Sequence, residues 1–519
     1  MGHSWSAGYV ADLPYTHGYY HELAPGFIRF GLLLAGLDHG GGDPTDQGHY
    51  RYCELGYGQG VSANLHAAAN PRGRFWGTDF HPEHALFAQG LAQRTGLSAK
   101  WLACSFEQLL DEDLPEFDLI TLHGVWSWID EPTREALLRF FQRRLKVGGV
   151  VYLSSNVMPG WSAERPLRDL MRLHTEAASA PGAGTATRIE AAVGFAGRLR
   201  QAGAAYFAHN PPAVQMLGDL QREDIHVVAH EYFNRAWQVG YFADLARSLE
   251  GAGLQFACSL HKSDLLGEVR QRARGCALEA LDLSLRETAH DFILNRRFRR
   301  DVFVRGARRL SEAEREARLL ELEFVLTRPA GNFGPTVGTP YGTVSLDGAL
   351  LRPLLQALET AAGPLSLQRL CADGGLQERP LASVLEPMVA LVAQGLVFPV
   401  FGDDLAHAGA SRARAINRVV AECTPHEDLI RYLASPVTGH AVEASWADRL
   451  MLIAWEQGAR AAPELAEVAR TAAPQAWESQ PASAASAEGP PSPLGEAERF
   501  LVRVAPAWRR LGILEGVDP

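Results

Sequence analysis

RYCELGYGQG, residues 51–60, passes from a short apolar run into three closely spaced glycines. This order predicts a β-strand, a tight turn and the start of a helix. Within it, Glu54, Gly56, Gly58 and Gly60 form the pattern E-x-G-x-G-x-G. Glycine lets the backbone turn sharply and approach a ligand closely, and a helix starting there would present free N–H groups to that ligand. The stretch also fits an ordinary strand-to-helix connection, so its meaning depends on the residues that follow.

A second strand with an acidic end favours a ligand site. Residues 74–79, RFWGTD, are strand-like and end in Asp79, one β-α-β unit after Glu54. In nucleotide-binding α/β folds, an acid at this place accepts hydrogen bonds from ribose hydroxyls. We therefore assign Asp79 and the adjacent Phe80 to a nucleoside site.

The glycine turn lacks the features of two other nucleotide-binding loops. No Lys-Ser/Thr pair ends it, as a phosphate-binding loop would require. Gly60 follows Gly58 by two residues, one fewer than the spacing of the dinucleotide fingerprint. Both differences favour a nucleoside ligand without a pyrophosphate.

Strands and helices alternate beyond the second strand. Residues 117–122, FDLITL, predict a strand, a helix follows, and residues 147–155, VGGVVYLSS, predict a turn and another apolar strand. Alternation of this kind indicates an α/β fold with a parallel sheet.

At this point the pattern resembles the class I S-adenosylmethionine (SAM) methyltransferases. Their first motif matches residues 54–60, their ribose-binding acid matches Asp79, and their fourth and fifth strands match residues 117–122 and 148–155. The resemblance implies a Rossmann-like methyltransferase sheet and SAM as the cofactor.

Five further stretches resemble a bacterial subfamily that carries a methyltransferase regulatory domain and includes rickettsial protein-lysine methyltransferases acting on outer-membrane proteins. They are DLPY at 12–15, LHGVWSWI at 122–129, SNVMPGW at 155–161, EYFN at 231–234 and NRRFRRDVFVRG at 295–306. The resemblance implies a methyl acceptor such as a protein lysine. A small-molecule, lipid or glycan acceptor, and a SAM-binding regulator without activity, remain as alternatives.

The resemblance places the adenine site after a third strand at residues 101–104. Ser105 stands there in place of the usual aspartate, followed by Phe106 and Glu107. We expect Ser105 and Phe106 to contact the cofactor, with adenine recognition resting on backbone groups, on packing against Phe106 or on Glu107.

The acceptor site should lie at the carboxyl ends of the strands. We assign to it His123 and Trp126 after the fourth strand, Asn156 and Trp161 after the fifth, and Tyr15 from an N-terminal lid. His123 is also assigned to the cofactor. Aromatic walls attract a sulfonium and an amine cation, and methyl transfer to a neutral amine needs mainly alignment and desolvation. Packing in the core is the alternative for His123 and the tryptophans.

The amino-acid composition argues against several classes of partner and site. A net charge of −11 argues against a general nucleic-acid binder. The six cysteines form no C-x-x-C motif, so we expect no metal site and no disulfide framework, in keeping with a reducing cytoplasm. No run approaches the about 20 apolar residues of a membrane span.

The 519 residues exceed one ordinary domain. The expected units are a SAM-binding core (1–164), a helical insertion serving a homodimer contact or an acceptor wall (165–235), a regulatory region supplying the sixth and seventh strands (236–310), a winged-helix-like domain (343–402), a helical region (403–471), a disordered linker (472–495) and a C-terminal helix (496–519). An independent α+β regulatory domain is the alternative to sheet completion. Seven arginines between 296 and 309 indicate a solvated face or an acidic-acceptor dock.

Overall fold

The protein is described here by a computed structural model. The residues it describes are 13, 15–38, 49–178, 182–261, 264, 278–331, 333, 336–339, 342–401, 405–479 and 492–515. Asp12 and Pro14 of the N-terminal motif, and residues 480–491 of the expected linker, lie outside them.

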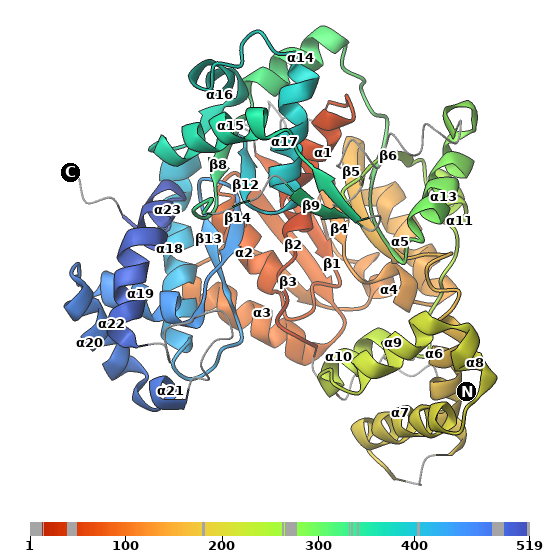
Figure 1. The fold of residues 1–519 in the computed structure, drawn as a ribbon. Coiled ribbons are helices and arrows are strands. Elements are labelled where there is room, and N and C mark those ends of the chain that lie inside the picture. Colours follow the sequence, from red (N-terminus) through yellow and green to blue (C-terminus); the bar gives the residue numbers. More distant parts are fainter. Residues whose placement is uncertain are drawn as a thin grey trace.

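A seven-stranded sheet in the order β3-β2-β1-β4-β5-β7-β6 forms the centre of the molecule (Figure 1). The strands are β1 (Tyr50–Leu55), β2 (Gly73–Asp79), β3 (Lys100–Ala103), β4 (Phe117–Leu122), β5 (Leu145–Asn156), β6 (Gln255–Ser259) and β7 (Phe298–Val304). The first five pair in parallel, and β7 runs antiparallel to both β5 and β6. The predicted Rossmann-like α/β fold is confirmed, and two strands from the regulatory region occupy the edge of the same sheet.

Helices cover both faces of the sheet because successive strand residues alternate between them. One face buries Tyr52 and Tyr152 against α1 (Pro25–Leu34), α2 (Val61–Ala69) and α3 (Pro82–Thr95). The other face buries Cys53, Ile120 and Leu153 beneath helices from both the core and the regulatory region. Those helices are α4 (Phe106–Leu109), α5 (Glu131–Arg144) and α11 (Phe242–Glu250). The remaining helical elements of the regulatory region are η5 (Leu278–Ala280) and α13 (Leu283–Leu294).

The helical insertion forms a separate bundle at the lower right of Figure 1. Its helices are α6 (Arg165–Ala177), α7 (Thr185–Gln201), α8 (Ala205–His209), α9 (Pro211–Leu220) and α10 (Ile225–Tyr232). They bury a core of their own around Met171, Ala192 and Leu217. The boundary drawn at residue 235 stays a prediction.

The region after the sheet shares the core of the α1–α2–α3 face. It holds α14 (Glu312–Glu321), a hairpin of β9 (Thr336–Thr339) and β10 (Gly342–Ser345), and a three-stranded sheet in the order β11-β8-β12. The expected three helices and closing strand are present as α15 (Gly348–Thr360), α16 (Leu367–Asp373), α17 (Leu381–Ala393) and β12 (Val397–Val400). Its middle strand, β8 (Glu323–Leu326), precedes all three helices, whereas β11 (Leu365–Ser366) lies between them. The winged-helix interpretation stays a prediction.

The C-terminal lobe packs through α18 (Leu405–Cys423) against α2 and α3, two helices that cover the central sheet. The expectation of an entirely helical region here was wrong, because β13 (Tyr432–Ser435) and β14 (His440–Glu443) form a hairpin. Pro436 is unsuited to a helix interior, and Gly439 has φ +71° in the turn. The remaining helices are α19 (Trp446–Glu456), α20 (Ala462–Ala472), α21 (Pro474–Ser479), α22 (Pro493–Arg499), the π-helical η6 (Phe500–Val504) and α23 (Ala505–Arg510). The short helix α21 falls within the stretch expected to be disordered.

The described residues also bear on membrane insertion and metal binding. In that part of the chain, no helix is both long enough and apolar enough to cross a membrane. It also holds no group of three or more histidine, cysteine or acidic residues arranged to bind a metal ion.

Candidate active site

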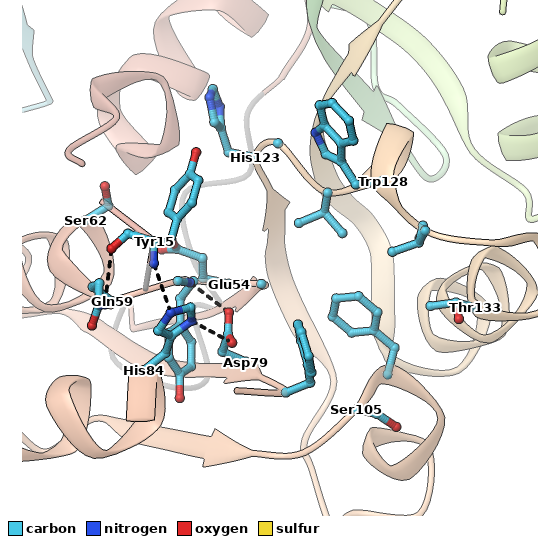
Figure 2. Close-up of a pocket in the computed structure, with 18 of the residues that line it drawn as sticks. Tyr15, Glu54, Gln59, Ser62, Asp79, His84, Ser105, His123, Trp128 and Thr133 are labelled. Atoms are coloured by element: carbon cyan, nitrogen blue, oxygen red, sulfur yellow. Dashed lines mark hydrogen bonds and ion pairs between the residues drawn. The ribbon is translucent and has the colours of Figure 1, made fainter. Parts of the chain in front are cut away.

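A cavity of about 490 Å³ opens where β1, β2 and β4 reach their carboxyl ends (Figure 2). Nine of the residues assigned from the sequence line it: Tyr15, Glu54, Gly56, Gly58, Asp79, Phe80, Ser105, Phe106 and His123. They come from the N-terminal segment and from four strand ends, so the sheet order brings them together. Their contact with SAM stays a prediction.

The glycine turn approaches the cavity through left-handed backbone. Gly56, Gly58 and Gly60 have φ values of +72°, +58° and +71°. A Cβ atom on Gly56 would lie 2.6 Å from Val125 Cγ2, and one on Gly58 would lie 3.5 Å from Tyr15 Cδ1. The turn therefore leaves room for a ligand only because side chains are absent.

Gly60 does not line the cavity, and its contact with the cofactor stays a prediction. It is the N-cap residue of α2, and a Cβ atom there would come within 2.5 Å of Ala88 Cβ. Gly60 permits the close approach of α2 to α3.

Asp79 is held rigidly at the end of β2. Its Oδ2 accepts a hydrogen bond from the Gly58 N–H at 2.9 Å, and its Oδ1 accepts one from the His81 N–H at 2.9 Å. His84 Nδ1 lies 3.2 Å from Oδ1. The sequence analysis missed His84, which α3 places three residues after its cap. A carboxylate fixed in this way can use its remaining lone pairs to accept hydrogen bonds from ribose hydroxyls.

Glu54 gives a direct test of whether the residues fit SAM. The side chain is 3% exposed, and the Tyr52 hydroxyl donates to its Oε2 at 3.3 Å. Burial raises the pKa of Glu54 to about 8, against a smaller lowering by the Tyr52 hydrogen bond. SAM carries a sulfonium and an ammonium, so its charge suits a buried carboxylate that lines the cavity.

At the end of the cavity where we expect the adenine, the polar side chains of Ser105 and Glu107 already form hydrogen bonds within the protein. Ser105 Oγ accepts from the Gln108 N–H at 3.3 Å as the cap of α4. Glu107 Oε1 accepts from the Thr133 hydroxyl at 2.9 Å. The apolar wall beside them consists of Phe106, Val125, Ile129 and Pro132. Of the three adenine mechanisms expected from the sequence, this arrangement favours packing against Phe106.

His123 lies at the other end of the cavity in an aromatic setting. Its ring stacks on Tyr20 with centroids 4.1 Å apart, and its Nδ1 lies 2.9 Å from the Tyr152 hydroxyl. Burial lowers the pKa of His123 to about 4. The imidazole is therefore neutral at pH 7 and adds no positive charge where a cationic ligand would bind.

Trp126, Asn156 and Trp161 do not line this cavity with Tyr15 and His123, and their part in an acceptor site stays a prediction. Trp126 packs in the core beneath α5, with the Arg134 guanidinium over its ring. Asn156 Oδ1 accepts from Trp161 Nε1 at 3.2 Å. Trp126 and Asn156 line a separate cavity of about 240 Å³.

Trp128 lines the main cavity instead of Trp126. Both belong to the 3₁₀-helix η3 (Trp126–Trp128), where residues two positions apart point in different directions. Trp128 stacks on Trp237, with centroids 6.0 Å apart. The aromatic composition of residues 122–129 was the only available signal, and it could not show which tryptophan faces the ligand.

Comparisons with known proteins agree with this geometry. Residues 53–151 match the model of a methyltransferase domain, and residues 224–305 match that of a predicted methyltransferase regulatory domain. The uncharacterized protein sll1526 of Synechocystis is 34% identical over 457 residues, which are 88% of each chain. The chain belongs to the SAM-dependent methyltransferases with a regulatory domain.

Two rickettsial proteins are similar to this methyltransferase. RP789 of Rickettsia prowazekii is 26% identical over 253 residues, which cover 47% of the methyltransferase and 44% of RP789. PKMT2 of Rickettsia typhi, solved in complex with S-adenosylhomocysteine (AdoHcy), has a TM-score of 0.67 at 16% identity. The match covers 96% of the methyltransferase and 99% of PKMT2, so the two share a fold over nearly their full lengths.

Proposed function

We propose that this methyltransferase transfers the methyl group of SAM to the side-chain amine of a protein lysine. The observation that carries the proposal is the aromatic lining of the cavity, to which Tyr15, Tyr20 and Trp128 contribute together with a neutral His123. Aromatic faces attract an alkylammonium and exclude water around it. The fold shared with PKMT2 and the resemblance of five sequence stretches to the subfamily that includes rickettsial protein-lysine methyltransferases support the same acceptor class.

The reaction requires that the acceptor amine be aligned with the methyl group of SAM and that water be excluded from the site. The amine nitrogen forms a bond to the methyl carbon while the carbon–sulfur bond breaks and its electron pair passes to sulfur. SAM supplies a methyl group already activated by the sulfonium charge. Asp79 would hold the ribose, and Tyr15 would cover the cavity above Gly58, where its ring already lies. Holding the reacting atoms in line can account for much of the rate.

Methyl-lysine formation is a direct test. The methyltransferase would be incubated with methyl-labelled SAM and fractionated bacterial extract, and labelled proteins would be digested and analysed by mass spectrometry. We expect methylated lysine in the protein fraction and none with Asp79→Ala. Label found only in lipid, glycan or small-molecule fractions would reject a protein acceptor.

We further propose a cytoplasmic homodimer. No two of the described cysteines form a disulfide, which supports a reducing compartment, and the separate helical bundle supports a role in contacts with a second copy. Light scattering on the purified chain tests the dimer, and a monomer at micromolar concentration would contradict it.

A further inference from the structure

Glu231, on α10, reaches the cavity through a tyrosine. The Tyr15 hydroxyl donates a hydrogen bond to Glu231 Oε1 at 3.3 Å and lies 3.5 Å from the Tyr20 hydroxyl. Both tyrosines line the main cavity. Glu231 belongs to the stretch that matches the regulatory domain, so that region sits one hydrogen bond from the candidate acceptor site.

The charge of Glu231 is not balanced by any residue that the structure describes. Two other buried glutamates have arginine partners, since Glu22 lies 2.9 Å from Arg300 and Glu164 lies 2.8 Å from Arg297. Glu54 resembles Glu231 in that its side chain accepts a hydrogen bond from a tyrosine hydroxyl. Glu231 forms no ion pair with any residue that the structure describes. Burial raises the pKa of Glu231, while the Tyr15 hydrogen bond acts in the opposite direction. A cation bound beside Tyr15 would supply the missing charge.

We infer that Glu231 is a positioning residue that acts through Tyr15 to orient the ammonium or amine of the methyl acceptor. The carboxylate accepts the hydrogen bond that the Tyr15 hydroxyl donates. A lone pair on the phenol oxygen then remains to accept a hydrogen bond from the nitrogen of the methyl acceptor. The inference rests on the proposed function to the extent that the acceptor is an amine. It assigns the regulatory region a direct part in acceptor recognition.

Tyr15 is held in place by contacts other than the one to Glu231. Its N–H faces His84 Nε2 at 3.5 Å, and its carbonyl oxygen accepts from Gln59 Nε2 at 3.2 Å, as Figure 2 shows. Its ring also meets the His230 ring edge-on, with centroids 5.1 Å apart. Changing Glu231 to glutamine should therefore remove the charge and leave the tyrosine where it is.

Sinefungin permits a test without the natural acceptor. This SAM analogue carries a primary amine in place of the methyl group, so it places an ammonium at the reacting position, whereas AdoHcy carries nothing there. The affinities of both for the full-length protein would be measured by calorimetry. The quantity compared is the ratio of the two dissociation constants. The variants are Glu231→Gln, Tyr15→Phe and, as a matched control on exposed backbone before α10, Glu223→Gln.

We expect Glu231→Gln and Tyr15→Phe each to lower the preference for sinefungin over AdoHcy by about tenfold, the scale of a charge-assisted hydrogen bond. AdoHcy affinity should stay within about twofold, and Glu223→Gln should match the wild type. An unchanged ratio in folded Glu231→Gln overturns the inference. If that variant does not fold, an unchanged ratio in Tyr15→Phe overturns it equally.

The result separates this inference from the proposed function. A lowered ratio without any methyl-lysine in the labelling experiment would keep Glu231 as an amine-orienting residue for a different acceptor. Methyl-lysine formation with an unchanged ratio would keep the lysine acceptor and remove Glu231 from its recognition.

Discussion

Asp79 Oδ2 accepts a hydrogen bond from the Gly58 N–H at 2.9 Å, which ties the end of β2 to the glycine turn after β1. The acid proposed to bind the ribose therefore also holds the turn proposed to approach the cofactor. A change at Asp79 should affect both at once.

Asp79→Ala should weaken SAM and AdoHcy binding by about 1–3 kcal/mol, the scale of hydrogen bonds to a charged group. Calorimetric titration measures the change, and Asp113→Ala, at an exposed loop residue, is the control. An affinity for AdoHcy equal to that of the wild type would remove Asp79 from the site.

Gly56→Ala should abolish measurable SAM binding and lower the melting temperature. The added Cβ would lie 2.6 Å from Val125 Cγ2, in backbone with φ +72°. Gly96→Ala is the matched control, because Gly96 has φ +67° with no atom within 4 Å of the added Cβ. It should cost about 1–2 kcal/mol of backbone strain and leave binding intact. Equal binding by both variants would contradict a ligand at this turn.

Glu54→Gln should stabilise the ligand-free protein at high pH while weakening SAM binding. The pKa of Glu54 is raised to about 8 by burial, against about 4.5 for an ordinary glutamate. A raised carboxyl pKa contributes stability below the unfolded-state value, and that stability is lost as pH rises through about 8. The wild type should therefore lose roughly 4 kcal/mol between pH 5 and pH 9 that the glutamine variant keeps, most of it below pH 8.

Thermal unfolding of both proteins without ligand at pH 6 and pH 9 measures the effect of Glu54. At pH 6 the wild type should already be about 2 kcal/mol less stable than the variant, because Glu54 is ionised in the unfolded chain and protonated in the folded one, and the difference should grow by pH 9. A variant that is no more stable than the wild type at pH 9 would show that Glu54 titrates lower than its burial indicates.

Trp128→Ala and Trp126→Ala should separate the cavity wall from the core. Trp126 is 8% exposed and Trp128 is 6% exposed, each within a buried cluster, so the loss of either should reduce the free energy of unfolding by about 3–5 kcal/mol. Trp128→Ala should lower turnover by roughly 100-fold, because a shift of the methyl acceptor by about 1 Å can reduce the rate by that factor. Turnover is compared at saturating SAM and at a temperature where both variants are folded. A larger turnover loss in Trp126→Ala would place Trp126 in the acceptor site.

Local sequence was sufficient for the strands, the turn and the place of Asp79 at the end of β2. The glycines of residues 51–60 are needed for positive φ angles, and the strands before the turn and before Asp79 have a recognisable residue pattern. Both signals are contained within a few consecutive residues. The hairpin at β13 and β14 was missed because Pro436 and Gly439 lie within a longer stretch of helix-forming composition. The choice between Trp126 and Trp128 was missed because one turn of a 3₁₀-helix decides it.

The sequence by itself determined that this protein has an α/β sheet with a nucleoside site, because glycine conformation and strand alternation act over a few residues. Only the tertiary structure decided which side chains meet in the cavity. Tyr15 and Glu231 stand 216 positions apart, and no local pattern relates them. Their contact exists because the helical bundle and the N-terminal segment meet at the same edge of the sheet, which depends on packing over the whole chain.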